Sequence, residues 1–270
     1  MWRAAVVLAV PALVALPERG SRPRAIPRPT PTRTAPAKPE LATEIRPGES
    51  LTYRISVRGV ESGRGALAVG KKKNKLVALR GAVEPLPLLR AFAPFSAEMV
   101  SYLDPRAGLP RRTVSTRTVD KKDTRSETTY LAAGGIEVRQ DGGPPTRLAQ
   151  RPAGATHDAL TALWSLRSRA HPAGERIEIV VLEGKQRHRV QIVAGPVEKL
   201  DTPAGELPAQ RFAGSWRQPG RRPRPFTLWL SADEARIPVR LEGQTRLGPA
   251  RFDLIAYTRP EAPPRRSARR

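Results

Sequence analysis

The strongest constraint on the fold is an alternation of apolar and polar residues with a period of two, which begins at Leu51. In the segment LTYRISV, Leu51, Tyr53, Ile55 and Val57 fall on one face and the polar residues between them on the other. This is the pattern of a β-strand with one buried face. Less regular alternation recurs in KLVALRGAV, AEMVSYL, RRTVSTRTV, RSETTYL, RIEIVVLE, RHRVQIV, PAQRFAGSW, PFTLWLS, IPVRLEGQTRL and ARFDLIAY.

These segments predict about 10 to 12 short strands separated by turn residues. Polar outer faces and a scarcity of helical patterns favour antiparallel pairing. We therefore expect a mainly β fold. It is a single curved antiparallel sheet or an open barrel of about 10–12 strands, with one amphipathic helix packed against it.

Three segments repeat one turn pattern: LDPRAGLPRRTV, LDTPAGELPAQRF and LSADEARIPVRL. Each has an acidic residue after an apolar strand end, namely Asp104, Asp201 and Asp233, then a short turn and a Leu-Pro or Ile-Pro pair. An aspartate in this position accepts a hydrogen bond from a turn amide, and a proline at the start of a strand needs no donor. We interpret these aspartates as turn residues rather than catalytic ones.

One segment breaks the period of two and predicts a helix. In THDALTALWSLRSR, Leu160, Leu163 and Trp164 recur at helical spacing, and Thr156 is a plausible N-cap. His157 and Asp158 form a pair at the helix start, which we interpret as capping, with acid–base chemistry as the alternative. A weaker helical turn, or a loop covering a sheet edge, is expected in PLPLLRAFAPF.

The ends of the chain differ from its middle. Ala4 to Leu16 is apolar but too short to cross a bilayer as a helix, which needs about 20 residues, so we predict a signal peptide at 1–17. Residues 18–47 are expected to be a proline-rich, basic, disordered linker, and 259–270 a basic disordered tail. The antiparallel β domain is placed at 48–258, and the protein is expected to be exported, to the periplasm or in association with the outer membrane.

The net charge of +23 favours anionic partners. Anionic envelope polymers or lipid head groups, bound through the basic arm, are the candidates. Nucleic acid is less favoured, because only 5% of the residues are aromatic and could stack on bases. GKKKNK and RQPGRRPRP could form a basic rim, although solvated loops are the simpler interpretation. The absence of cysteine excludes disulfides, thiol catalysis and cysteine-based metal sites.

Five segments together carry a resemblance: LTYRISVRGVESGRGALAV, VSYLDPRAGLPRR, HDALTALWSLR, LDTPAGELPAQRF and LWLSADEARIPVRLEGQTRLGPARFDLIAY. In order and spacing they resemble the family of exported bacterial proteins known as domain of unknown function 3108, from Leu51 to about Tyr257. The resemblance implies an envelope protein with a mostly antiparallel β domain. It implies no catalytic residues. The excess of basic over acidic residues and the proline-rich arm of this chain depart from the family's usual pattern.

Motifs for chemistry are missing from the sequence. His157, His171 and His188 stand far apart and in no metal-binding frame, and no phosphate-binding or nucleotide-binding loop occurs, so we expect no metal and no cofactor. A curved sheet with one helix can enclose an apolar groove. The aromatic candidates for lining it, each also explicable as core, are Tyr53, Tyr102, Trp164, Trp216 and Trp229.

The sequence thus favours a non-enzymatic envelope protein that binds a lipid, a lipoprotein or another envelope component, or that serves as a scaffold. The alternative is an envelope hydrolase or a polysaccharide-modifying enzyme that uses carboxylates, for which Asp158, Glu183 and Glu242 are the candidates. Nucleic-acid binding is the third interpretation.

Overall fold

The structure is a computed structural model that describes residues 46–90, 95–119, 122–131, 134–148, 155–217, 222–245 and 247–259. The predicted signal peptide, almost all of the linker and the last residues of the tail lie outside this part. The strands are β1 (Ser50–Val57), β2 (Val60–Lys73), β3 (Leu76–Pro85), β4 (Phe95–Asp104), β5 (Leu109–Val119), β6 (Lys122–Tyr130), β7 (Ile136–Gln140), β8 (Thr146–Leu148), β9 (Thr156–His157), β10 (Arg176–Glu183), β11 (Gln186–Thr202), β12 (Gly205–Arg217), β13 (Arg224–Ser231), β14 (Pro238–Thr245) and β15 (Gly248–Thr258). The helices are α1 (Pro87–Arg90) and α2 (Ala159–Arg167).

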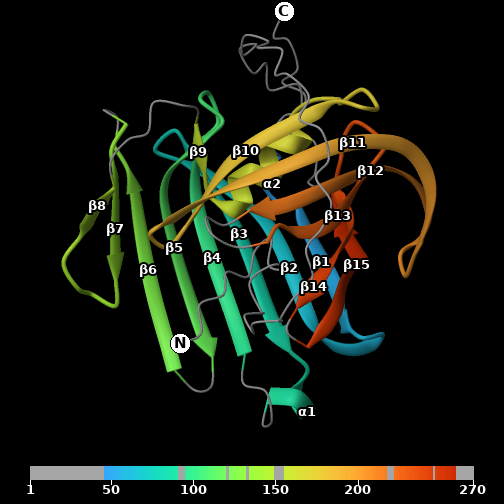
Figure 1. The fold of residues 1–270 in the computed structure, drawn as a ribbon, viewed down its shortest axis with the longest axis horizontal. Helices are drawn as coiled ribbons and strands as arrows, with labels where there is room; N and C mark the ends of the chain where they lie inside the picture. The colour runs from blue at the N-terminus through green and yellow to red at the C-terminus, as the bar shows by residue number, and fades with distance from the viewer. Residues whose placement is uncertain are drawn as a thin grey trace, which may run out of the picture.

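The strands form one strongly curved sheet in the order β8-β7-β6-β5-β4-β3-β2-β1-β15-β14-β13-β12-β11-β10-β9 (Figure 1). Neighbouring strands are antiparallel, except that β9 lies parallel to β10. The mainly β fold with one curved sheet is confirmed. The sheet has 15 strands rather than about 10–12, because the alternation pattern missed β2, which is rich in glycine, and the short strands β7, β8 and β9.

Helix α2 lies inside the curve of the sheet (Figure 1). One side of the helix packs on β10–β13 through Leu163 and Leu166, and the other side packs on β2–β4 through Leu160 and Trp164. Eight of its nine residues are buried, so the helix is enclosed more completely than an amphipathic surface helix would be.

The start of α2 corrects the predicted N-cap. Thr156 and His157 are in strand β9, and Asp158 is the N-cap. Its carboxylate accepts a hydrogen bond from the backbone N–H of Thr161 at 2.9 Å, and the Thr161 hydroxyl accepts one from the Asp158 backbone N–H at 3.1 Å. This reciprocal capping satisfies two backbone donors at the helix start.

The two lateral edges of the sheet lie close together. Leu182, on β10, packs against Ile136 and Val138, on β7. In the described residues β8 and β9 are the edge strands and do not pair with each other. The curve is therefore closed on this side by apolar packing, and the sheet stays open in its hydrogen bonding.

The long β11–β12 hairpin curls over the outer face of β13 and β14 (Figure 1). The indole N–H of Trp229 donates to Oε1 of Glu198 at 2.5 Å, and the guanidinium of Arg240 donates to the carbonyl of Asp201 at 2.5 Å. Both faces of the second half of β13 are buried as a result.

The repeated aspartate turns occur with one change. Asp104 accepts the backbone N–H of Arg106 at 3.0 Å, and Asp233 accepts that of Arg236 at 3.2 Å. In the β11–β12 turn the acceptor of the turn amide is the hydroxyl of Thr202, which receives the N–H of Ala204 at 3.2 Å. Asp201 precedes that residue and pairs in the strand ladder.

The PLPLLRAFAPF segment contains the short helix α1, and the rest of the loop at 91–94 lies outside the described residues. No helix in the part of the chain that the structure describes is long and apolar enough to cross a membrane.

Candidate functional site

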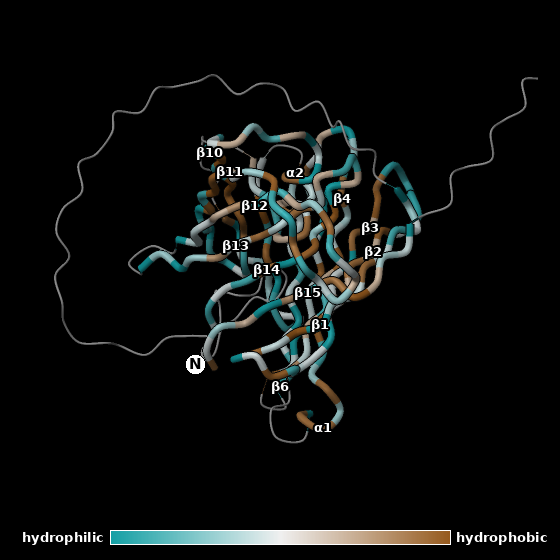
Figure 2. Tube along the Cα trace, turned by 90° about the vertical axis from the view of Figure 1, so that its right-hand side faces the viewer, coloured by the Kyte–Doolittle hydropathy of each residue, from teal (hydrophilic) through white to brown (hydrophobic). Residues whose placement is uncertain are grey.

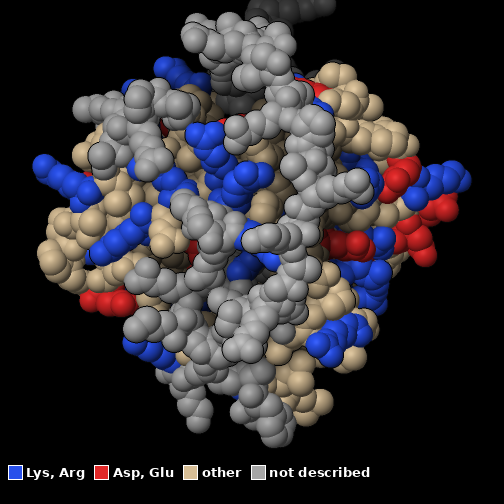
Figure 3. Space-filling view, in the orientation of Figure 1, with Lys and Arg blue, Asp and Glu red and all other residues tan. Residues whose placement is uncertain are grey.

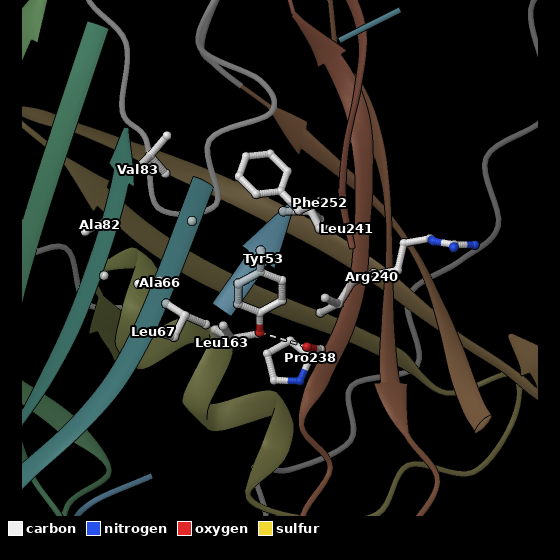
Figure 4. Close-up of a pocket in the computed structure, with 13 residues that line it drawn as sticks. Tyr53, Ala66, Leu67, Ala82, Val83, Leu163, Pro238, Arg240, Leu241 and Phe252 are labelled. Carbon is white, nitrogen blue, oxygen red and sulfur yellow. Dashed lines mark hydrogen bonds between the residues drawn. The ribbon is translucent and has the colours of Figure 1, made fainter. Parts of the chain in front are cut away.

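The concave side of the sheet holds a small apolar cavity of about 60 Å³ (Figure 4). It lies between β1–β3 and β13–β15, with α2 beside it. Its lining is Tyr53, Gly65, Ala66, Leu67, Gly81, Ala82, Val83, Leu163, Leu228, Pro238, Arg240, Leu241 and Phe252. Because about 10–15 Å³ of such volume holds one water molecule, the cavity has room for roughly four to six groups of that size.

Glycine creates part of this space. A Cβ at Gly65 would lie 3.4 Å from the Cβ of Tyr53 and 3.7 Å from a ring carbon of Phe252, which are ordinary van der Waals contacts. A Cβ at Gly65 would therefore fit without a clash and would reduce the free space. Nothing in the sequence indicates this role, because a glycine in a strand more often marks a bulge or a close backbone approach.

A second, larger hollow lies on the opposite face of the sheet. Leu163 of α2 lines the cavity (Figure 4), and Val83 lies near the end of β3 that leads to α1. The larger hollow has about 420 Å³ and lies where β1 and β14 end and β13 and β15 begin. Its lining is Ser56, Gly59, Pro225, Phe226, Thr227, Glu242, Gly243, Gln244, Pro249, Ala250 and Arg251. Its lining residues Thr227, Glu242 and Arg251 alternate along β13–β15 with residues that line the cavity, so the two spaces open on different faces.

The polar groups of the cavity wall already have partners. The hydroxyl of Tyr53 donates to the carbonyl of Pro238 at 2.8 Å. Burial raises the pKa of Tyr53 well above its usual value, so this hydroxyl stays protonated. The guanidinium of Arg240 donates to Asp253 at 2.6 Å and to the carbonyl of Asp201. What the wall offers a ligand is therefore apolar surface.

Of the five aromatic residues named from the sequence, Tyr53 lines this cavity and the other four lie elsewhere. Trp164 is buried beside β2–β4 with the Arg167 guanidinium 4.4 Å from its ring centroid. Trp216 is buried in the core, 4.9 Å from the ring of His188. Trp229 faces the other side of the sheet, and Tyr102 is half-buried, with Arg112 at 5.9 Å from its ring.

A protein-family model described as "Protein of unknown function (DUF3108)" matches residues 52–255. The chain belongs to this family. The membership confirms the resemblance carried by the strand and turn segments.

A solved structure with a TM-score above 0.5 shares the fold of this DUF3108 chain, and others align with lower scores. A β-barrel-like protein of domain of unknown function DUF1849 from Brucella abortus has a TM-score of 0.59 at 12% identity, covering 80% of this chain and 98% of that one. A candidate exported protein with a YmcC-like fold from Bacteroides fragilis has a TM-score of 0.33 at 10% identity, covering 81% and 99%. A candidate lipoprotein from Parabacteroides distasonis has a TM-score of 0.34 at 10% identity, covering 81% and 98%. No curated protein matched the chain.

In the helix-start pair of this DUF3108 domain, Asp158 is buried against the sheet and His157 is partly buried. Oδ2 of Asp158 accepts hydrogen bonds from the hydroxyls of Ser101, at 2.5 Å, and Thr113, at 2.6 Å. Both oxygens of this carboxylate are thus engaged by donors from β4, β5 and α2. Burial lowers the pKa of His157 against the opposing charge of Asp158, so the imidazole is held neutral. These contacts hold the start of α2 against β4 and β5.

The other two carboxylates named from the sequence lie on different strands. Glu183 is at the end of β10, with Oε2 3.7 Å from Nε2 of His188, and Glu242 is on β14 and lines the larger hollow. Among the described residues no group of three or more histidine or acidic side chains could hold a metal ion. The RQPGRRPRP loop lies partly outside the described residues, and Lys71, Lys72 and Lys73 are exposed at the end of β2.

The sequence interpretation missed a buried ion pair. Glu49, which precedes β1, accepts two hydrogen bonds from Arg167 at the end of α2, at 2.8 and 3.0 Å, and the two side chains are 2% and 4% exposed. Tyr257 donates to the same carboxylate at 3.2 Å. Glu49 stands beside the proline-rich segment, and nothing in the local sequence distinguishes it from a solvated linker residue.

His188 provides a pH-dependent contribution to stability. It is 1% exposed, and burial lowers its pKa from 6.5 to about 4. In the unfolded chain the same imidazole takes up a proton near pH 6.5. Acidification from pH 6.5 to about 4 therefore favours the unfolded state, and this contribution is present above pH 6.5 and lost as the pH falls towards 4.

We expect the His188→Phe variant to lose less of its free energy of unfolding than the parent protein between pH 6.5 and 4. Phenylalanine keeps an aromatic ring against Trp216 but binds no proton. Urea unfolding at a series of pH values measures the difference, with the same series for Lys199→Ala as an exposed control. Parallel pH profiles for the parent and His188→Phe would contradict the assignment.

Proposed function

We propose that this DUF3108 protein is exported to the cell envelope and binds an apolar chain, the acyl chain of a lipid or of a lipoprotein, without catalysis. The observation that supports this most directly is the apolar cavity on the concave side of the sheet, whose polar wall groups are already hydrogen-bonded. A polar ligand would compete with these bonds, whereas an acyl chain has no hydrogen bonds with water to give up when it enters.

The volume of the cavity suits the end of an acyl chain rather than a whole ligand. Drug-sized ligand sites usually have about 300–1,000 Å³, so a cavity of about 60 Å³ accepts only the terminal groups of a narrow molecule. The rest of the chain and its head group would remain outside the cavity. Lys and Arg side chains are spread over the face seen in Figure 3, which suits an anionic head group or surface.

The first test is to purify the full chain under native conditions, extract it with organic solvent and identify lipids by mass spectrometry. We expect a lipid at close to one equivalent, or an empty protein that binds cis-parinaric acid, a fluorescent fatty acid. An empty protein that binds no fatty acid would overturn the proposal and favour a scaffold.

We expect Gly65→Val to lower the affinity for cis-parinaric acid about tenfold, roughly 1.4 kcal/mol, because the new methyl groups occupy the cavity. A Cβ at this position makes only ordinary contacts and valine favours strands, and circular dichroism checks that the two γ-methyl groups leave the fold intact. Ala68→Val is the matched control. It adds methyl groups to the same strand at a position that does not line the cavity. Equal affinity of the two variants would exclude this cavity as the site.

A further inference from the structure

Three neighbouring turns at one end of the molecule each present a large, exposed aliphatic side chain. Val60, in the β1–β2 hairpin, is 66% exposed, Leu88, in α1, is 84% exposed, and Leu247, in the β14–β15 turn, is 58% exposed. These three, here called the rim residues, are half of the six large apolar side chains that stand exposed in the described part of the chain. Scattered single exposed side chains are normal, so their grouping is what requires an explanation.

Hydrogen bonds show that the three turns are contiguous. The backbone N–H of Arg58 donates to the carbonyl of Pro249 at 2.8 Å, and its side chain donates to the carbonyl of Leu247. On the other side, the N–H of Leu86 donates to the carbonyl of Ser62 at 3.0 Å, which joins the α1 segment to the start of β2. The order β14–β15, β1–β2, α1 follows the strand order of the sheet.

This end of the molecule lies away from α2 (Figure 1). Leu163 of α2 lines the cavity, and Gly59 and Pro249, from two of the same turns, line the larger hollow. Figure 1 shows α1 projecting beyond the ends of the strands, and Figure 2 shows it as an apolar segment at the same extremity.

Basic side chains accompany the rim residues. Arg58 and Arg90 lie on the same turns, and Arg64 lies on the adjoining part of β2. Arg64 pairs with Glu61, Arg90 pairs with Glu84, and Arg58 bonds to a carbonyl, so these segments carry three positive and two negative charges. Isolated aliphatic tips together with arginine suit the boundary between lipid head groups and acyl chains. A protein partner would more often be met by a tyrosine or tryptophan anchor, and these turns have none in their described residues.

We propose that the rim residues dock this protein on the surface of an anionic phospholipid bilayer, with the aliphatic tips inserted at the head-group level. The docking itself depends only on the rim residues. That an acyl chain passes between the bilayer and the cavity rests on the proposed function.

The absence of cysteine from the chain allows a site-specific test. Single cysteines are introduced in the full chain by Leu88→Cys and Leu247→Cys, labelled with the environment-sensitive dye NBD, and mixed with vesicles of equal parts phosphatidylglycerol and phosphatidylcholine. Matched controls are Leu131→Cys and Val197→Cys, which replace aliphatic side chains that are 39% and 56% exposed elsewhere on the fold. This readout reports insertion at the labelled position, so binding of the basic N-terminal residues to the vesicles cannot imitate it.

We expect a blue shift and an increase in emission of about twofold or more at Leu88→Cys and Leu247→Cys, and no change at the control positions. We also expect Leu88→Glu combined with Leu247→Glu to reduce vesicle binding about tenfold in a flotation assay at 0.5 M NaCl, where charge attraction is screened. Unchanged dye emission at both rim positions, or an equal response at the controls, would overturn the docking.

Two further measurements separate this proposal from the proposed function. The double glutamate variant should keep its affinity for cis-parinaric acid in solution, because neither position lines the cavity. Gly65→Val should keep its insertion signal on vesicles. Insertion of the rim residues without fatty-acid binding would support the docking proposal and contradict the proposed function. Fatty-acid binding without insertion would support the proposed function and contradict the docking proposal.

Discussion

Glu49→Ala is expected to lower the free energy of unfolding by about 3–5 kcal/mol, the largest effect of a single substitution that we expect in this protein. The change leaves the guanidinium of Arg167 buried, 4% exposed, without the carboxylate that accepts two of its hydrogen bonds. Two contacts that remain, the carbonyl of Ala235 at 3.1 Å and the ring of Trp164, carry no negative charge. Urea denaturation followed by tryptophan fluorescence measures the loss.

The double variant Glu49→Leu with Arg167→Met distinguishes ion pairing from packing. Replacing both charges by apolar groups removes the buried unpaired charge, so at least half of the lost stability should return. Glu206→Ala is the control, because its partner Lys199 and its own side chain are exposed, and its effect should stay within about 1 kcal/mol. A loss of less than 1 kcal/mol in Glu49→Ala would mean that the pair does not hold α2 to the start of β1.

Asp158→Ala is expected to cost about 2–4 kcal/mol. Loss of an N-cap side chain typically costs about 0.5–2 kcal/mol. The hydroxyls of Ser101 and Thr113 also lose their shared buried acceptor, and an unsatisfied buried polar group costs about 1–3 kcal/mol. The same denaturation experiment measures this change.

Asp158→Asn is the informative companion, because its amide keeps the shape and one acceptor for the N–H of Thr161, while the two hydroxyls can turn to accept. We expect it to retain most of the stability that Asp158→Ala loses. If Asp158→Ala were as stable as the wild type, this carboxylate would have no structural role. It would then again be a candidate catalytic residue of a hydrolase, together with Glu183 and Glu242.

The periodic parts of the sequence predicted the fold well, and its irregular parts did not. Alternation over LTYRISV and its counterparts gave the strands with one buried face, because a period of two reflects the geometry of a pleated strand. It missed β2, where Gly63 and Gly65 stand at positions that face inwards and therefore carry no hydrophobic side chain. It missed β9 because two residues are too few to show a period.

The candidate site could be predicted only in part, because its features arise from contacts across the sheet. Tyr53 was identified since it shares the inner face of β1, but Gly65 and Phe252 meet it only after β2 and β15 pair with that strand. The sequence does not distinguish Trp164, Trp216 and Trp229 from one another, and yet they occupy three different environments. Glu49 and Arg167, 118 residues apart, are joined by tertiary structure alone.

The overlap of Leu182 with Ile136 and Val138 has a consequence for the size of the interior. In a closed barrel the number of strands and their stagger fix the radius, because widening it would break a continuous ladder of hydrogen bonds. Here, in the described residues, the two lateral margins meet through aliphatic side chains, and no ladder of hydrogen bonds joins them. The width of the interior is therefore set by side-chain packing rather than by a closed ladder.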